Sequence, residues 1–278
     1  MRKWNTFAFL TFVAMTAASC RETTIVAQSP HEFYIQNGFQ GYSGANDVVV
    51  TRLEGFVPEP GSIMVDSYKY RPLRSLIHFD LSKSLHKIPC DPKLDVVKAV
   101  LYLHRYKQWV ITGGPVDMAI QLYSFPESHK SFLQGANFDA ATGYTKPEMD
   151  NVFINSGHPG NVRQWMAFNL SRSLVQKWIC DPSSNKGMVL KSGSEEDSVL
   201  MDPRGYANFF SSNATTDSAG NNVTELRPML YIEFSDTPNG VPGEATKSNP
   251  GGRTAAPSYD PADFEPLRKF ELLRDSNS

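Results

Sequence analysis

The chain lacks the excess of positive charge that is typical of nucleic-acid-binding proteins and the cysteine spacing that is typical of metal sites. Its 27 lysines and arginines are offset by 29 acidic residues, which leaves a formal net charge of −2. Nucleic-acid binding depends on clustered positive charge that releases counterions from phosphates. The three cysteines do not have the spacing of metal ligands. We therefore expect no nucleic-acid partner and no metal site.

Catalytic motifs are missing as well. The sequence contains no His-Glu-x-x-His, no Gly-x-Ser-x-Gly and no glycine-rich phosphate loop. Two of its scattered histidines, His78 and His104, fall in strand-like runs and are interpreted as core or surface residues. Glycoside hydrolysis needs only two carboxylates that the fold brings together, so a polysaccharide-degrading enzyme stays open as a less favoured alternative. We expect a non-enzyme without catalytic residues or a cofactor.

The amino terminus has the pattern of an export signal. Two basic residues open the chain, an apolar stretch follows at 7–14, and small residues lead to Cys20. This stretch is shorter than the roughly 20 residues of a membrane-spanning helix. We predict a lipoprotein-type signal peptide over 1–19 with Cys20 lipidated, and ordinary cleavage near the same site is the alternative. Both outcomes place the protein in the cell envelope, anchored to a membrane through Cys20 or secreted, with residues 20–33 as a tether.

Two further cysteines, Cys90 and Cys180, are each followed by Asp-Pro. This dipeptide places each cysteine at the start of a turn, and turns at one end of a β-fold can approach each other. An even number of thiols beyond the cytosol favours pairing. Pairing also requires Cα atoms within about 7 Å. A Cys90–Cys180 disulfide and two unpaired thiols are therefore both open.

Short β-rich segments separated by turn residues run through most of the chain. In segments such as 76–81, apolar positions recur at close to every second residue, which is typical of a sheet with one buried face. No helices alternate with these segments, which argues against a doubly wound parallel fold. The pattern predicts an all-β fold, an antiparallel jelly-roll β-sandwich. The predicted strands cover residues 47–53, 75–81, 96–106, 116–125, 165–170, 187–191, 206–211 and 228–234.

Two segments differ from this pattern. Ser171 is followed by apolar residues at helical spacing, which predicts one short helix over 171–178. After residue 236 the composition shifts to Pro, Gly, Asn, Ser and Thr, so residues 237–278 are predicted to be a disordered low-complexity tail. Within this tail, 263–275 has the pattern of a short amphipathic helix. Docking on the domain, binding a partner and fraying are all open for that helix.

Aromatic and basic residues supply the candidate ligand contacts. Sugars bind by placing their C–H faces on aromatic rings while polar side chains hold the hydroxyls. We select Trp109, Tyr68 and Tyr70 as ring platforms, and Arg105 and Lys107 as partners for acidic sugars. Core packing is the alternative role for each ring, and a solvated surface charge is the alternative for each cation. Further candidates of the same two kinds are Tyr102, Tyr106, Tyr123, Arg52, Arg71 and Arg74.

A series of short motifs follows in order along residues 34–236. Residues 39–48 read Phe-Gln-Gly-Tyr-Ser-Gly-Ala-Asn-Asp-Val, and residues 74–82 read Arg-Ser-Leu-Ile-His-Phe-Asp-Leu-Ser. Val-Lys-Ala-Val-Leu-Tyr-Leu follows at 97–103. In order and spacing the series resembles the DNRLRE domain, a jelly-roll β-sandwich family of bacterial secreted proteins related to alginate-type carbohydrate-binding modules. The later motifs are at 168–178, 185–191, 210–212 and 227–232.

The resemblance implies a DNRLRE-like domain over 34–236 that binds rather than catalyses. It implies a non-catalytic carbohydrate-binding or adhesive module at the cell envelope, whose partner is an extracellular polysaccharide, acidic where arginine or lysine takes part. The alternative is a structural or assembly protein of the envelope that acts through protein–protein contacts. Family members often carry a tryptophan segment where 132–138 has none, and a glutamate where this chain has Asn213. The resemblance therefore concerns the scaffold more than a ligand site.

Overall fold

The computed structural model describes the chain from residue 31 to residue 276, with gaps. The predicted signal peptide 1–19, the lipidation site Cys20 and the tether up to residue 30 lie outside the described residues, as does 237–260 of the predicted tail. The described residues are 31–52, 54–55, 57–66, 72–84, 88–91, 93–110, 118–132, 137–146, 148–154, 163–193, 205–235 and 261–276.

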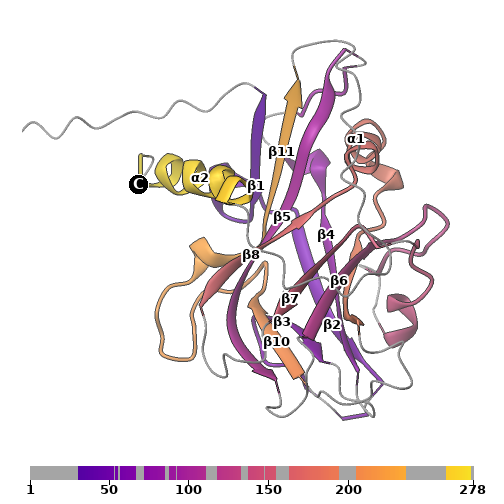
Figure 1. Cartoon of the computed structure of the whole chain (residues 1–278), viewed down its shortest axis with the longest axis vertical. Helices are drawn as coiled ribbons and strands as arrows, with labels where there is room; N and C mark the ends of the chain where they lie inside the picture. Colours follow the sequence, from indigo (N-terminus) through magenta and orange to yellow (C-terminus); the bar gives the residue numbers. More distant parts are fainter. Residues whose placement is uncertain are drawn as a thin grey trace, which may run out of the picture.

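Among the described residues, eleven antiparallel strands form one curled sheet (Figure 1). Their order along the sheet is β1-β11-β5-β10-β3-β4-β9-β6-β7, with β2 paired to β4 and β8 paired to β5. Two α-helices accompany them in the described part of the chain, so the prediction of an all-β fold is confirmed. The strands are β1 (Glu32–Gln36), β2 (Ala45–Thr51), β3 (Ser62–Asp66), β4 (Leu73–Phe79), β5 (Asp95–Val110), β6 (Met118–Ser124), β7 (Asp150–Ile154), β8 (Gln164–Asn169), β9 (Met188–Ser192), β10 (Gly205–Phe210) and β11 (Met229–Ser235).

Each predicted strand overlaps a strand of the sheet, and three strands are absent from the prediction. These are β1, β3 and β7, each five residues long. Five residues show too few alternations to be recognised by periodicity, and β7 opens with Asp150 and Asn151, which are typical of turns. β1 begins at Glu32, inside the segment predicted as a tether, because pairing with β11 places Glu32 opposite Glu233.

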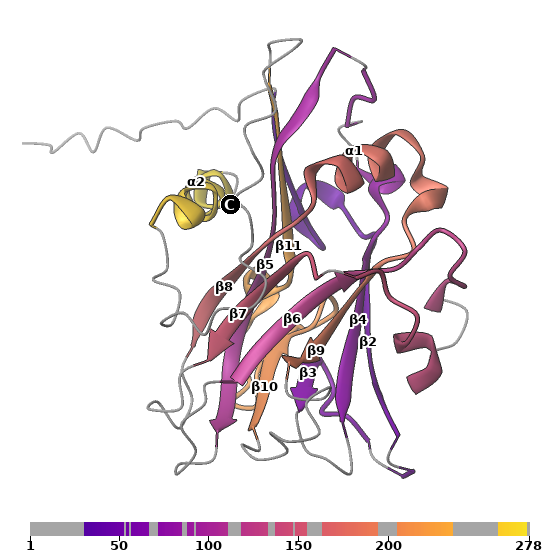
Figure 2. The same ribbon diagram turned by 45° about the vertical axis from the view of Figure 1, so that its right-hand side comes forward.

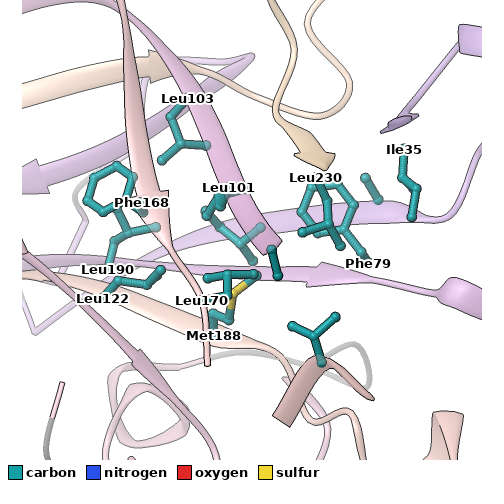
Figure 3. Packing of buried hydrophobic residues seen from close by; sticks show 14 of the residues in the cluster. Ile35, Phe79, Leu101, Leu103, Leu122, Phe168, Leu170, Met188, Leu190 and Leu230 are labelled. Atoms are coloured by element: carbon teal, nitrogen blue, oxygen red, sulfur yellow. The ribbon is translucent and has the colours of Figure 1, made fainter. Parts of the chain in front are cut away.

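The inner face of the curled sheet holds the main hydrophobic core (Figure 3). Ala99, Leu101 and Leu103 of β5 belong to it, together with side chains from strands far from β5 in the sheet order. Complete burial of a leucine stabilises the fold by about 1.5–3 kcal/mol relative to exposure. This shared core therefore favours the curled shape over a flat sheet. Well-buried members include Leu122, Phe168, Met188, Leu190 and Leu230.

Helix α1 (Arg172–Cys180) packs against the same core. It corresponds to the helix predicted over 171–178, and its buried apolar residues are Val175, Trp178 and Ile179. Ser171 occupies the N-cap position, but its side chain makes no capping hydrogen bond. In the described part of the chain, no helix is long and apolar enough to cross a membrane.

A disulfide ties the end of α1 to the segment before β5. Cys180, the last residue of α1, is bonded to Cys90, and their Cα atoms are 5.0 Å apart. Of the two alternatives that the sequence left open, the structure contains the bonded one. Both Asp-Pro turns therefore lie at the same place on the molecule.

Helix α2 (Glu265–Ser276) lies outside the sheet beside β1 (Figure 1). Leu267, Phe270 and Leu273 of this helix are buried against apolar side chains of β1, β5 and β11. The short amphipathic helix predicted over 263–275 is therefore present, and it is docked on the domain, one of the three roles left open for it. Burial of these side chains offsets the entropy of ordering the segment, a contribution that composition alone does not report.

Candidate functional site

A bulge in β5 separates two residues that we selected from the sequence as partners for acidic sugars. Arg105 pairs with Phe209 of β10, whereas Lys107 pairs with Asn208, so Tyr106 is an extra residue between them. One extra residue reverses the side-chain alternation for the rest of a strand. Arg105 is 4% exposed, while the Lys107 side chain is 44% exposed. The structure does not bring these two cations together at a common surface.

Lys107 lies on the exposed side of this bulge among polar groups. Its Nζ atom is 3.9 Å from the Glu59 carboxylate and 6.0 Å from the centroid of the Tyr206 ring. Glu59 also accepts a hydrogen bond of 3.1 Å from the Asn208 side chain. Lys107 therefore lies beside both a carboxylate and an aromatic ring.

The rings selected from the sequence are described only in part. Trp109 continues β5 opposite Tyr206 of β10, and its backbone alone is described. Tyr68 and Tyr70 lie outside the described residues. Their proposed contacts with a ligand stay predictions.

Four rings form a continuous series on the outer face of the sheet, here named the aromatic strip: Trp165, His104, Phe210 and Tyr106. Trp165 meets His104 edge-on with ring centroids 5.1 Å apart, and His104 stacks on Phe210 at 5.7 Å. Phe210 in turn stacks on Tyr106 at 4.5 Å. The two outermost rings, Trp165 and Tyr106, are half-buried, whereas His104 and Phe210 are buried. The strip thus has an accessible ring at each end, supported by two buried rings.

Three strands position these rings. His104 of β5 is the cross-strand partner of Trp165 in β8, and Phe210 ends β10. Tyr106 is the extra residue of the β5 bulge, which leaves its ring against Phe210. Tyr102 and Tyr106 are four residues apart, so a regular strand would direct both side chains to one face of the sheet. This spacing is the one sequence signal for the outer face. Trp165 and Phe210 were missed because cross-strand neighbours cannot be recognised from one strand.

The aromatic strip carries no charge near neutral pH. Burial, assisted by the charge of Arg163, lowers the pKa of His104 from 6.5 to about 4. Burial and the charge of Glu59 raise the pKa of Tyr106 from 10.0 to about 12. A general acid or base works best with a pKa near the working pH. Neither group is therefore suited to proton transfer at neutral pH, and the strip offers apolar ring surface instead.

Cations lie next to both accessible ends of the aromatic strip. Two residues before Trp165, Arg163 pairs with Asp217 at 2.6 Å, and its side chain is 51% exposed. Lys107 follows Tyr106 directly in the chain. Flat rings flanked by hydrogen-bonding groups match the apolar face and the polar rim of a sugar ring.

Two other predicted cations, Arg52 and Arg74, meet elsewhere on the outside of the sheet. Their guanidinium carbons are 4.6 Å and 4.7 Å from the centroid of the Phe138 ring. Arg74 also donates a hydrogen bond of 2.7 Å to the carbonyl of Ala141. Phe138 and Ala141 belong to one short 3-10 turn and are buried, so these arginines hold that turn against the sheet. Arg71 lies outside the described residues.

Residues of three of the motifs, at 39–48, 210–212 and 227–232, meet in a cluster of polar side chains that hydrogen-bond to backbone groups. The Asn37 side chain donates hydrogen bonds to the carbonyls of Ala45 and Ser212, at 2.8 Å and 3.0 Å. The Asp47 carboxylate accepts one of 2.6 Å from the Ser212 amide. Arg227 donates to the carbonyl of Asn37 at 3.1 Å. Asp47, Ser212 and Arg227 belong to these motifs, and together with Asn37 they join loops and hold the scaffold together.

No metal centre accompanies the aromatic strip: among the described residues, no group of three or more His, Cys, Asp or Glu side chains could hold an ion. Comparison with protein-family models gives no match for this chain, and no curated protein matches it either. Its function is therefore inferred from the chemistry of its own residues.

Proposed function

We propose that the protein is a non-catalytic carbohydrate-binding or adhesive module exposed at the cell envelope. The aromatic strip supports this most, because it presents the rings of Trp165 and Tyr106 on one outer face beside two exposed cations. Each end ring is already held by a buried ring, because Trp165 packs edge-on against His104 and Tyr106 stacks on Phe210. Rings held in this way lose little conformational entropy when a ligand binds. Their apolar faces suit the C–H face of a sugar.

The proposed ligand is an extracellular polysaccharide, and it is acidic where arginine or lysine takes part in binding. The Arg163 guanidinium has five N–H donors, and one of its nitrogens donates the hydrogen bond to Asp217. Lys107 remains 44% exposed beside Glu59. Both cations are therefore placed to meet uronate groups of a chain that stacks on the rings between them.

The proposal includes the scaffold and the location of the module. Order and spacing of the motifs along 34–236 support a jelly roll of the DNRLRE type, and the curled antiparallel sheet agrees with it. The basic, apolar and small residues ahead of Cys20 support export and a lipid anchor. An anchored module would hold its aromatic strip among the polysaccharides of the envelope.

Affinity electrophoresis of the full chain through alginate, pectin and neutral glucans tests the proposal. We expect at least one polysaccharide to retard the wild type, and Trp165→Ala to remove most of the retardation. Trp109→Ala tests the ring selected from the sequence. Tyr144→Ala is the matched control, because this half-buried ring lies near Arg74 on another part of the outer surface. A natively folded wild type that none of these polysaccharides retards would contradict the proposal and favour an assembly protein.

A further inference from the structure

Helix α2 lies outside the sheet (Figure 2). It covers further aromatic side chains on the outer face of the sheet. Leu267, Phe270 and Leu273 are only 4%, 0% and 6% exposed in this position. Without α2, the side chains beneath it would form an exposed apolar patch of a kind that usually marks a binding surface. These side chains are Tyr34, Val100, Tyr102, Met229 and Tyr231.

The covered side chains and the aromatic strip belong to one surface. Tyr102 lies two residues before His104 on β5, and Trp165 packs against the cluster under α2. At about 3.4 Å per residue, the stretch of β5 from Val100 to Tyr106 is about 20 Å long. Helix α2 covers the first half of this stretch and leaves the second half to the aromatic strip.

The docked helix leaves a polar atom without a partner. Tyr34 is 6% exposed, and its ring stacks on Phe270 with centroids 5.6 Å apart. Among the described residues, the Tyr34 hydroxyl has no hydrogen bond. A buried hydroxyl without a partner disfavours the docked state. A ligand rich in hydroxyl groups would satisfy this atom where α2 does not.

The edge of the covered face is acidic. Glu32 and Glu233 lie opposite each other on β1 and β11, and like charges in this arrangement repel. The Tyr231 hydroxyl is 3.2 Å from the first carboxylate and 3.0 Å from the second. Lys269 of α2 pairs with Glu32 at 3.0 Å. Docking of α2 thus combines apolar contacts with the neutralisation of an acidic pair.

Helix α2 depends on this face for its own structure. It has 12 residues, and isolated helices of that length are marginal in water. A segment tethered to its docking surface meets it at an effective concentration of about a millimolar. Weak contacts therefore suffice to keep α2 docked until a ligand competes for the face, and undocking also unfolds the helix.

We propose that α2 is a displaceable cover over half of a longer carbohydrate-binding surface. A polysaccharide on the aromatic strip extends along β5 onto Tyr102, Tyr231 and Tyr34 and releases α2. The sugar units that replace α2 are uncharged, because Glu32 and Glu233 accept hydrogen bonds from hydroxyls and repel uronates. This inference rests on the function proposed for the aromatic strip.

Phe270→Ser in the full chain removes the central apolar contact of α2 and leaves the sheet unchanged. Calorimetric titration with neutral glucan oligosaccharides of increasing length measures the effect. If α2 is docked in about 90–99% of molecules, its release tightens the binding of long chains about 10- to 100-fold. Short oligosaccharides that fit the aromatic strip alone should bind both proteins equally. Leu272→Ser is the matched control, because Leu272 of α2 is 55% exposed, and this variant should bind as the wild type does.

Hydrogen–deuterium exchange supplies a second readout. Saturating long glucan should speed the exchange of backbone amides in residues 265–276 of the wild type. If Phe270→Ser bound long glucans no more tightly than the wild type, the proposal that α2 is a displaceable cover would be wrong. Retardation of the wild type by any polysaccharide would still support the proposed function. Absence of binding to every polysaccharide in both proteins would overturn both proposals.

Lys269→Glu provides the same test without touching the apolar contact. Lys269 is 41% exposed, and the reversed charge would face Glu32 and repel it. We expect the same gain on long neutral glucans, with no gain on alginate. Lys269→Arg keeps the ion pair and serves as its control.

Discussion

The Asp47 carboxylate accepts a hydrogen bond of 2.6 Å from the backbone amide of Ser212, 165 residues further along the chain. The bond joins the start of β2 to the loop that follows β10. Burial raises the pKa of the Asp47 carboxyl, and hydrogen bonds from Ser212 and Ser211 oppose that rise. A residue of the segment 39–48 is thus a structural link.

Asp47→Ala should lower the free energy of unfolding by about 1–3 kcal/mol, because the Ser212 amide loses its acceptor. Asp47→Asn keeps an acceptor and should lose less. The folded-state pKa is raised, so the folded chain holds the proton more tightly than the unfolded chain. The stability from Asp47 is therefore fully present below the unfolded pKa and declines as the pH rises through the folded pKa.

Urea unfolding of the wild type and Asp47→Asn across the acidic range checks this pH dependence. The wild type should gain stability relative to the variant as the pH falls. If the difference in the free energy of unfolding between the two proteins did not change with pH, the pKa of Asp47 would be the same in the folded and the unfolded chain.

His104 should make the fold sensitive to acid. Its pKa is lowered from 6.5 to about 4, so the unfolded chain takes up a proton that the folded chain excludes. The stability from neutral His104 is present above the unfolded pKa and is lost as the pH falls through about 4, by up to about 3 kcal/mol. His104→Phe keeps a ring between Trp165 and Phe210 and cannot titrate. Urea unfolding at neutral and mildly acidic pH should show a smaller loss in the variant; equal losses would refute this role.

Two glycines form a matched pair for a steric test. Gly187 and Gly220 both have positive φ, +89° and +83°. A Cβ atom at Gly187 would lie 2.8 Å from the Ile77 carbonyl oxygen and 2.8 Å from the Phe132 ring, whereas at Gly220 it would meet nothing within 4 Å. Gly220→Ala should therefore cost about 1–2 kcal/mol from backbone strain alone. Gly187→Ala should cost about 3 kcal/mol or more in urea unfolding, and equal losses would argue against the close approach.

The disulfide should contribute much of the stability. Cys90 and Cys180 are separated by 90 residues, and closing a loop of this size restricts the unfolded chain. Replacing both by serine should lower the free energy of unfolding by about 2–5 kcal/mol. The reduced wild type should match the double variant in thermal unfolding. A reduced wild type as stable as the oxidised one would contradict the bond's contribution.

Strands and helix α1 could be predicted because their signals are local. The alternation in β4 and the run in β5 depend on residues two positions apart, and the apolar spacing after Ser171 predicts α1. β7 escaped recognition since its first residues, Asp150 and Asn151, resemble a turn until pairing with β6 places them in the sheet.

Local sequence patterns suffice to predict most of the strands, the all-β class and the amphipathic pattern of α2, because each depends on residues a few positions apart. The three-dimensional structure alone brings Cys90 to Cys180 and places α2 over an aromatic face. It also decided that the bulge at Tyr106 parts Arg105 from Lys107. Each of these outcomes depends on contacts between distant strands, and their free energy comes from burial and register that no single segment contains.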